Sequence, residues 1–340
     1  MQQNVTITYQ EVPRFNPGDP AAMDYLEEEG FVVFANALSN DEAAQSLSML
    51  WDYLEELGTG IDRNDIDTWG DERWPTAVHG AILPSHGIGH CAAQWFIRDV
   101  PNVKTCFGQV WDTEELLVSF DGVTIWRPWT HNEAWRTNEG NSWLHIDQHP
   151  IGRPGKHCVQ GLVNLLPTSP ATGGNVVVPG SHRSFEHIPE KYAERLARIH
   201  PSIDHFRYPK DDPLLSETNP IMCHMEAGDL LLWDSRTIHC SAPGLERPAD
   251  SHSLLRAASL ICMMPKAKSN PKVLEARKAA VATRTSTTNW SDRFINADEF
   301  PQILDAPDRD KYQWPPEPKL NHNQLLMVGW DEAELKSMAS

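Results

Sequence analysis

Short β-rich runs separated by turn residues dominate the chain from about residue 116 to residue 265. Gly, Pro, Asn, Asp or Ser lies between one run and the next. Strands at this spacing are typical of a β-sandwich or barrel. The runs are ELLVSF, VTIWRPW, SWLHIDQ, HCVQGLVNLLP, NVVVPGSH, DLLLWDSRTIH and RAASLICMMP. We therefore predict a mainly β protein with flanking helices, whose core spans residues 116–265.

The segment before this core, residues 20–115, is predicted to form a buttress of helices and loops. A first acidic helix ends at Gly30, and the apolar run FVVFANAL follows as a short strand. Ser39 and Glu42 then match a Ser-x-x-Glu capping box, after which apolar residues recur at helical spacing to about residue 58. This pattern indicates an amphipathic helix that packs on the sheet.

Two further helical segments lie around the core. Residues 92–112 indicate a helix with breaks at Pro101 and Gly108. After the core, residues 266–340 form a C-terminal appendage, whose first helix is expected to be capped by Asn270, with a proline at its first position. Because the chain shows no internal repeat and no long Gly/Ser linker, we predict one domain over residues 1–340.

Charge and composition limit the classes of partner. The chain has 29 Lys and Arg against 47 Asp and Glu, a formal net charge of −18. This balance argues against general binding to nucleic acid or to an anionic membrane, which need basic surface. No apolar run is long enough to span a bilayer, and the N-terminus lacks the pattern of a signal peptide. Six cysteines without a paired spacing predict reduced thiols and a cytoplasmic protein.

Three side chains point to a metal centre. On a strand, residues i and i+2 share a face, so His145 and Asp147 in SWLHIDQHP can address one ion. His239 closes another apolar run, GDLLLWDSRTIH, which a rolled sheet can bring alongside. Two imidazoles and one carboxylate on one face of Fe(II) leave positions open for an oxo acid and O2. A His-x-Asp pair also arises by chance, so a redox-silent cupin-like isomerase or a binding protein stays a second hypothesis.

An arginine at the start of the last apolar run could anchor the oxo acid. Arg256 opens RAASLICMMP, and a guanidinium matches a carboxylate through two parallel hydrogen bonds. Arg247 is the alternative anchor, but it lies in the loop GLERPADS. We prefer Arg256 because a strand holds a side chain more rigidly than a loop does.

Several of these motifs together resemble the phytanoyl-CoA dioxygenase family. They are FVVFANALSNDEA, WLHIDQ, GGNVVVPGSHR, GDLLLWDSRTIH and LLRAASL, within about residues 20–265. The resemblance implies a double-stranded β-helix (jelly-roll, cupin-like) core, with Fe(II) as cofactor and 2-oxoglutarate and O2 as cosubstrates. It also implies that His145, Asp147 and His239 hold the iron and that Arg256 binds the C5 carboxylate of 2-oxoglutarate. The segment between His239 and Arg256 is longer than usual for the family, and residues 266–340 are not a common part of it.

The resemblance further implies the reaction class. A C–H bond of a small-molecule substrate is expected to be hydroxylated, with release of succinate and CO2. Desaturation, cyclisation or demethylation of a natural-product intermediate on the same site is the alternative, because these reactions need identical metal ligands. Neither the substrate nor the oligomeric state is defined by these motifs.

Six other residues are candidates for binding the cosubstrate or the substrate. Gln160 lies on the strand after Asp147 and could contact 2-oxoglutarate or a metal ligand, and Ser119 is the second candidate for the cosubstrate. Trp143 should share the inward face with His145, although a buried Trp belongs to the core more often than to a substrate site. The substrate candidates are Asp121, Arg127, Trp143 and Trp233.

Overall fold

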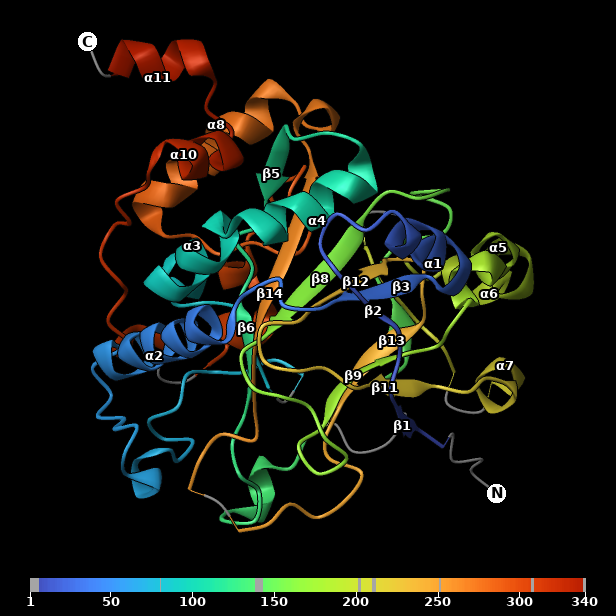
Figure 1. Cartoon of the computed structure of the whole chain (residues 1–340), viewed down its shortest axis with the longest axis horizontal. Helices are drawn as coiled ribbons and strands as arrows, with labels where there is room; N and C mark the ends of the chain where they lie inside the picture. The colour runs from blue at the N-terminus through green and yellow to red at the C-terminus, as the bar shows by residue number, and fades with distance from the viewer. Residues whose placement is uncertain are drawn as a thin grey trace.

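Two β-sheets form the centre of the protein (Figure 1). In the eight-stranded sheet, β5 (Leu116–Val118) pairs with β14, and the other strands follow the order β2 (Arg14–Phe15), β3 (Phe31–Phe34), β12 (Leu230–Asp234), β8 (Val159–Asn164), β14 (Arg256–Pro265), β6 (Val123–Trp126) and β4 (Ile82–Leu83). The six-stranded sheet has the order β1 (Thr8–Gln10), β11 (Ile221–Cys223), β9 (Gly174–Val177), β13 (His239–Ala242), β7 (His145–Ile146) and β10 (Phe206–Arg207). This computed structural model describes residues 6–79, 81–137, 143–200, 203–209, 212–250, 252–306 and 309–338.

The chain passes repeatedly from one sheet to the other along the predicted core. Strands β6, β8, β12 and β14 belong to the larger sheet, and β7, β9, β11 and β13 belong to the smaller one. All the pairings among these strands are antiparallel. The predicted class, mainly β with flanking helices, is confirmed. Because β7 and β13 are neighbours, segments far apart in the sequence meet inside the sandwich.

The larger sheet is buried on both faces, and β12 shows how. Leu231 and Trp233 pack with Val177 and Ile221 in the core between the two sheets. Leu230 and Leu232, which alternate with them along the strand, pack on the opposite face, in the core shared with the helices. A strand buried on both sides reads as a continuous apolar run rather than an alternating one, which explains the sequence DLLLW.

Helices cover the outer face of the larger sheet, where α3 and α4 pack against β14 (Figure 1). The α-helices lie before, within and after the strands. They are α1 (Ala21–Glu29), α2 (Asn40–Glu56), α3 (Ala92–Asp99), α4 (Pro101–Trp111), α5 (Ile188–Lys191), α6 (Ala193–Leu196), α7 (Pro213–Glu217), α8 (Pro271–Thr283), α9 (Pro301–Leu304), α10 (His322–Val328) and α11 (Glu332–Met338).

Local signals for helix ends match the structure in most places. Gly30 ends α1 with a φ of 77°, a left-handed conformation that favours glycine. Ser39 and Glu42 form the predicted capping box of α2, and Asn270 caps α8 through the Val273 amide. The expected break at Gly108 is wrong, because this glycine lies inside α4, whereas Pro101 does separate α3 from α4.

The structure also corrects the position of His239. We expected this residue at the end of the DLLLW strand, but β12 ends at Asp234 and His239 is the first residue of β13. A turn separates the two strands, and the Asp234 carboxylate accepts hydrogen bonds from the backbone and side chain of Arg236 there. The turn moves the chain from the larger sheet to the smaller one immediately before the histidine.

Two general features complete the fold. Within the described ranges, no helix is both long enough and apolar enough to cross a membrane. All six cysteines are buried and free. The division of residues 1–340 into a buttress, a core and an appendage stays a prediction, although β3 of the N-terminal segment is a full member of the larger sheet.

Candidate functional site: a cluster of two histidines and one aspartate

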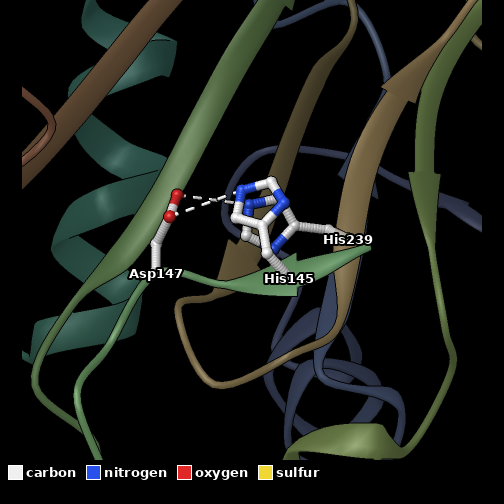
Figure 2. A group of neighbouring side chains, drawn as sticks. All are labelled: His145, Asp147 and His239. Carbon is white, nitrogen blue, oxygen red and sulfur yellow. Dashed lines mark ion pairs between the residues drawn. The ribbon is translucent and has the colours of Figure 1, made fainter. Parts of the chain in front are cut away.

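His145, Asp147 and His239 converge inside the sandwich (Figure 2), and we refer to them as the His–Asp–His cluster. His145 begins β7, and its Cα pairs with that of His239 at the start of β13. Asp147 follows β7 directly, and its carboxylate oxygens lie 3.4 Å from His145 Nε2 and 3.3 Å from His239 Nε2. One potential ligand atom from each residue lies within 4.8 Å of the others, so the three side chains could hold one metal ion.

Hydrogen bonds fix the orientation of each ring and of the carboxylate. His145 Nδ1 lies 2.7 Å from the Trp143 carbonyl oxygen, and His239 Nδ1 lies 2.8 Å from the Thr237 carbonyl oxygen. A carbonyl can only accept, so Nδ1 carries the proton, and Nε2 of a neutral ring has a lone pair for a metal. Gln160 Nε2 donates to Asp147 Oδ2 at 3.1 Å. The cluster is therefore preorganised as a ligand set.

The cluster favours an ionised carboxylate. Burial alone would raise the pKa of Asp147, but when the histidines are protonated the charge of His145 and hydrogen bonds from both rings hold this pKa well below its ordinary value. Burial lowers the pKa of His239, and the neighbouring His145 lowers it further. Burial also opposes the charged form of His145, but Asp147 raises the pKa of that ring. The site thus concentrates negative charge on Asp147, where a cation would lie.

A cavity of about 420 Å³ adjoins the cluster, and Arg256 lines it. Arg256 is only 1 % exposed. Its Nη1 donates to Ser241 Oγ at 2.9 Å, whereas its Nε has no hydrogen-bond partner. Among the described residues, no carboxylate forms an ion pair with this guanidinium, and burial lowers its pKa to about 10. A buried cation without an anion is costly, so the cavity can accept an anionic ligand at Arg256.

Arg247 has a different environment. Its side chain is 60 % exposed, its Nη1 lies 3.2 Å from Glu133 Oε1, and its guanidinium stacks on Trp129. It does not line the cavity. Of the two candidate arginines, Arg256 is the one that faces the His–Asp–His cluster.

Four of the other candidate residues also line the cavity: Gln160, Asp121, Trp143 and Trp233. Trp143 stacks on His145, with ring centroids 4.9 Å apart, and its indole Nε1 donates to the Ser241 carbonyl. Trp233 packs against His239 at 5.3 Å between ring centroids. Gln160 both lines the cavity and donates a hydrogen bond to Asp147, which helps to orient that carboxylate.

Two candidate residues, Ser119 and Arg127, do not line this cavity. Ser119 follows the end of β5, and its Oγ accepts a hydrogen bond from the Cys262 amide, so it links two segments of the sheet. The regular strand that would have turned Ser119 towards the cavity stops at Val118. Arg127 donates to the Trp69 carbonyl and to Asp71, which draws its guanidinium away from the cavity.

Several cavity residues were not predicted from the sequence. His79, Asn175, His205 and Arg207 lie around the cluster. Ser241 could have been found, because it lies two residues after His239 on β13 and therefore shares its face. More unexpectedly, the appendage supplies a side of the cavity, which we call the C-terminal wall. It consists of residues 287–290 with Ile295, Ala297 and Phe300.

Comparisons with known proteins agree with this site. A profile of the phytanoyl-CoA dioxygenase (PhyH) family matches residues 26–245. A protein of Aspergillus versicolor named Ava biosynthesis cluster protein O is 31 % identical over 283 residues, covering 80 % of this chain and 86 % of that protein. A Dictyostelium discoideum protein provisionally named a phytanoyl-CoA dioxygenase is 25 % identical over 255 residues, covering 64 % of this chain and 69 % of that protein.

A solved structure shows the same fold over nearly the whole chain. It is a protein of Salmonella typhimurium LT2, provisionally described as an oxidoreductase, with a TM-score of 0.58 and 14 % identity. The similarity covers 94 % of this chain and 86 % of that one, and at this identity it concerns the fold alone.

The family profile covers more than half of the chain and contains all three residues of the His–Asp–His cluster. An oxygenase of the iron-dependent type is the class of enzyme that this match supports. The chain belongs to the phytanoyl-CoA dioxygenase family.

Proposed function

We propose that this protein is an Fe(II)- and 2-oxoglutarate-dependent dioxygenase whose iron ligands are His145, Asp147 and His239. The strand orders β6–β14–β8–β12 and β11–β9–β13–β7 support a double-stranded β-helix as its core. Two imidazole nitrogens and one carboxylate on one side of a site suit ferrous iron and leave positions for exchangeable ligands. When bound, the iron would supply the oxidising chemistry, since protein side chains alone cannot activate O2 for attack on a C–H bond.

The observation that carries the proposal is the buried Arg256 guanidinium in the cavity of the His–Asp–His cluster. Its Nε lacks a partner, and its Nη1 has only the Ser241 hydroxyl. A dicarboxylate that chelates the metal at one end would present its distal carboxylate to this group. The pair of charge-assisted hydrogen bonds formed there would offset the desolvation of both ions.

The chain's own residues would then hold the reactants and exclude water. Gln160 holds Asp147, and the Trp143 carbonyl fixes the ring of His145. In a hydroxylation, a substrate C–H bond becomes C–OH and 2-oxoglutarate becomes succinate and CO2. One oxygen atom of O2 enters the alcohol, and the other enters succinate. The substrate is expected to be a small molecule, because the cavity has a volume of about 420 Å³.

Other oxidations remain compatible with this site. Desaturation, cyclisation or demethylation would use the same ligands and the same Arg256. The Aspergillus versicolor relative bears the name of a biosynthesis cluster protein, which favours a natural-product intermediate as the substrate. A non-oxidative isomerase or a metal-binding protein would have no use for a carboxylate anchor.

Ligand binding tests the proposal directly. Changing His145, Asp147 or His239 to alanine should abolish tight Fe(II) binding in an anaerobic titration. In protein loaded with Fe(II), Arg256→Met should weaken 2-oxoglutarate binding by at least about 30-fold, because a loss of about 2 kcal/mol is the lower range for a desolvated charge pair.

Arg247→Met is the matched control, since it removes an exposed arginine of the same region. This control should bind 2-oxoglutarate like the parent. Undiminished iron affinity in the His145 and His239 variants would refute the metal site. Equal 2-oxoglutarate affinity in Arg256→Met and the parent would refute the cosubstrate assignment.

A further inference from the structure

The C-terminal wall is attached to the turn that carries Asp121. Thr287 exchanges two hydrogen bonds with Phe120: its amide donates to the Phe120 carbonyl at 2.8 Å, and its Oγ1 accepts from the Phe120 amide at 3.0 Å. Ser286, one residue earlier, accepts from the Gly89 amide and donates its own amide to Asp298. The wall and the turn between β5 and β6 therefore form one continuous, tied surface of the cavity.

Asp121 presents a carboxylate to this cavity. Its Oδ1 accepts one hydrogen bond from the Gly122 amide at 2.8 Å. The ion pairs of the described residues include none with Asp121. Gln94 and Arg98 on α3 donate hydrogen bonds to the backbone carbonyls of the turn. The carboxylate is thus fixed in place, and one side of it is available to a ligand.

The other acidic groups of the cavity already have partners. Asp147 lies between His145 and His239, and Asp204 pairs with Arg153. Asp121 has Arg98 nearby, but this guanidinium donates to backbone carbonyls rather than to the carboxylate. The Asp121 side chain is only partly exposed, and a partly desolvated carboxylate without a direct cation becomes more favourable when a ligand supplies one.

Two basic side chains of the cavity lie beside the His–Asp–His cluster. Arg207 pairs in register with His145 across β10 and β7, and His79 stacks on Trp143, the next ring from His145. Asp121 instead adjoins the C-terminal wall, whose side chains Trp290, Ile295 and Phe300 are apolar and whose residues 287–289 are polar and uncharged. Arg153 and Arg293 stack on Trp290 but do not line the cavity themselves. The cavity therefore combines an apolar surface with a negative group on the wall side.

We propose that the substrate is an apolar molecule that carries a cationic nitrogen, which binds to the carboxylate of Asp121 against the C-terminal wall. This assignment takes one point from the proposed function, namely that the substrate binds in this cavity. An ammonium or amidinium nitrogen would donate hydrogen bonds to Asp121 while the hydrocarbon part of the molecule covers the wall. Asp121 is then a specificity-determining residue. The C-terminal wall, which lies outside residues 26–245 matched by the family profile, contributes to substrate recognition as well.

Matched probes test the proposal. Naphthylethylamine, naphthylethanol and naphthylacetate share one apolar body and differ in the charge of the end group. Their affinities are measured by anaerobic calorimetry, both for protein loaded with Fe(II) and 2-oxoglutarate and for metal-free protein. The amine should bind at least about tenfold more tightly than the alcohol or the acid, a difference of about 1.4 kcal/mol.

Three variants locate the effect. Asp121→Asn keeps an oxygen for the Gly122 amide and should abolish the preference for the amine. Asp121→Glu keeps the charge and should retain part of the preference. Asp24→Asn, which removes an exposed aspartate on α1, should leave it unchanged.

The outcomes separate this proposal from the enzymatic one. Normal 2-oxoglutarate binding in Asp121→Asn shows that the variant is folded. Equal affinities for amine and alcohol in the parent would overturn the cation assignment and leave the dioxygenase proposal intact. Tightest binding of the acid, with loss in Arg207→Met, would assign an anionic substrate instead. If the parent protein loaded with Fe(II) does not bind 2-oxoglutarate, the enzymatic proposal is refuted. The preference of the metal-free parent for the amine over the alcohol would still decide the role of Asp121.

Discussion

Arg256 combines deep burial with incomplete pairing, and this should be visible in the stability of the protein. Its guanidinium is 1 % exposed, and its Nε has no acceptor. An apolar side chain of similar volume is often as stable or more stable at such a position, so a ligand that pairs with Arg256 would explain why an arginine lies there. The free energy of unfolding and the affinity for the anion should therefore respond in opposite directions to one substitution.

We expect Arg256→Met to raise the free energy of unfolding of the ligand-free protein by about 1–3 kcal/mol, since it removes a buried, underpaired charge. Saturating 2-oxoglutarate should stabilise the Fe(II)-loaded parent but not the variant. Urea unfolding with and without 2-oxoglutarate measures both effects. A variant less stable than the parent would show that Arg256 has a structural role instead.

The charge of Asp121 should make probe binding depend on pH. Burial raises the pKa of this carboxyl to about 6, with a further increase from Asp147, while the Gly122 amide and Arg98 act in the opposite direction. Below about pH 6 the group is therefore protonated in the free protein. The amine probe keeps its charge, because alkylammonium groups titrate near a pKa of about 10.

The affinity of metal-free protein for naphthylethylamine should consequently fall as the pH drops below about 6, approaching tenfold per pH unit. The affinity for naphthylethanol should not follow this curve. Calorimetry between about pH 5 and about pH 8 gives both profiles. A flat profile for the amine would exclude Asp121 as its partner.

At the level of single elements, the contribution of the α2 capping box to the free energy of unfolding can be measured directly. Ser39 Oγ accepts from the Glu42 amide, and the Glu42 carboxylate accepts from the Ser39 amide. We expect Ser39→Ala to lower the free energy of unfolding by about 1 kcal/mol, while Ser39→Asn, which restores a side-chain acceptor, should be close to neutral. Chemical denaturation compares the two variants, and equal losses would show that the cap contributes little.

Sequence patterns predicted elements well where the signal was local. The start of β14 at Arg256, the cap of α8 at Asn270 and the helix end at Gly30 each depend on a few adjacent residues. Two predictions failed because tertiary context decided them. Gly108 stays helical within α4, and the run DLLLWDSRTIH is split by the turn after Asp234. Neither outcome is encoded in the apolar pattern itself.

At the scale of the whole molecule, Arg277 joins the appendage to the sheet. This buried side chain of α8 donates to the carbonyls of Val328, Ser291, Val118 and Met327. We expect Arg277→Met to cost about 3 kcal/mol or more, because it leaves several buried carbonyls without donors. It should also weaken naphthylethylamine binding by loosening the C-terminal wall. Lys272→Met, at an exposed position of the same helix, is the control for both measurements.

One side of the cavity could be predicted from the sequence, and the other could not. The His–Asp–His cluster could be predicted because His145 and Asp147 follow the two-residue period of a strand and His239 closes a recognisable apolar run. Arg256 could be predicted because it opens such a run. The C-terminal wall could not, since residues 287–300 have no periodic pattern and reach the cavity only through long-range contacts such as that between Thr287 and Phe120. Ser119 and Arg127 lie away from the cavity for the related reason that side-chain direction outside regular strands is set by distant partners.

The pairing of β3 with β12 has a consequence for how the chain is made. The four residues Phe31–Phe34 are all buried. The short β2 pairs with two of them, but the strand that pairs with all four begins only at Leu230. During synthesis this apolar stretch leaves the ribosome long before the strand that will cover it, and unpaired apolar strands of this kind promote association between nascent chains. We therefore expect the nascent chain to need temporary shielding of β3, by its own early helices or by a chaperone, until β12 has been synthesised.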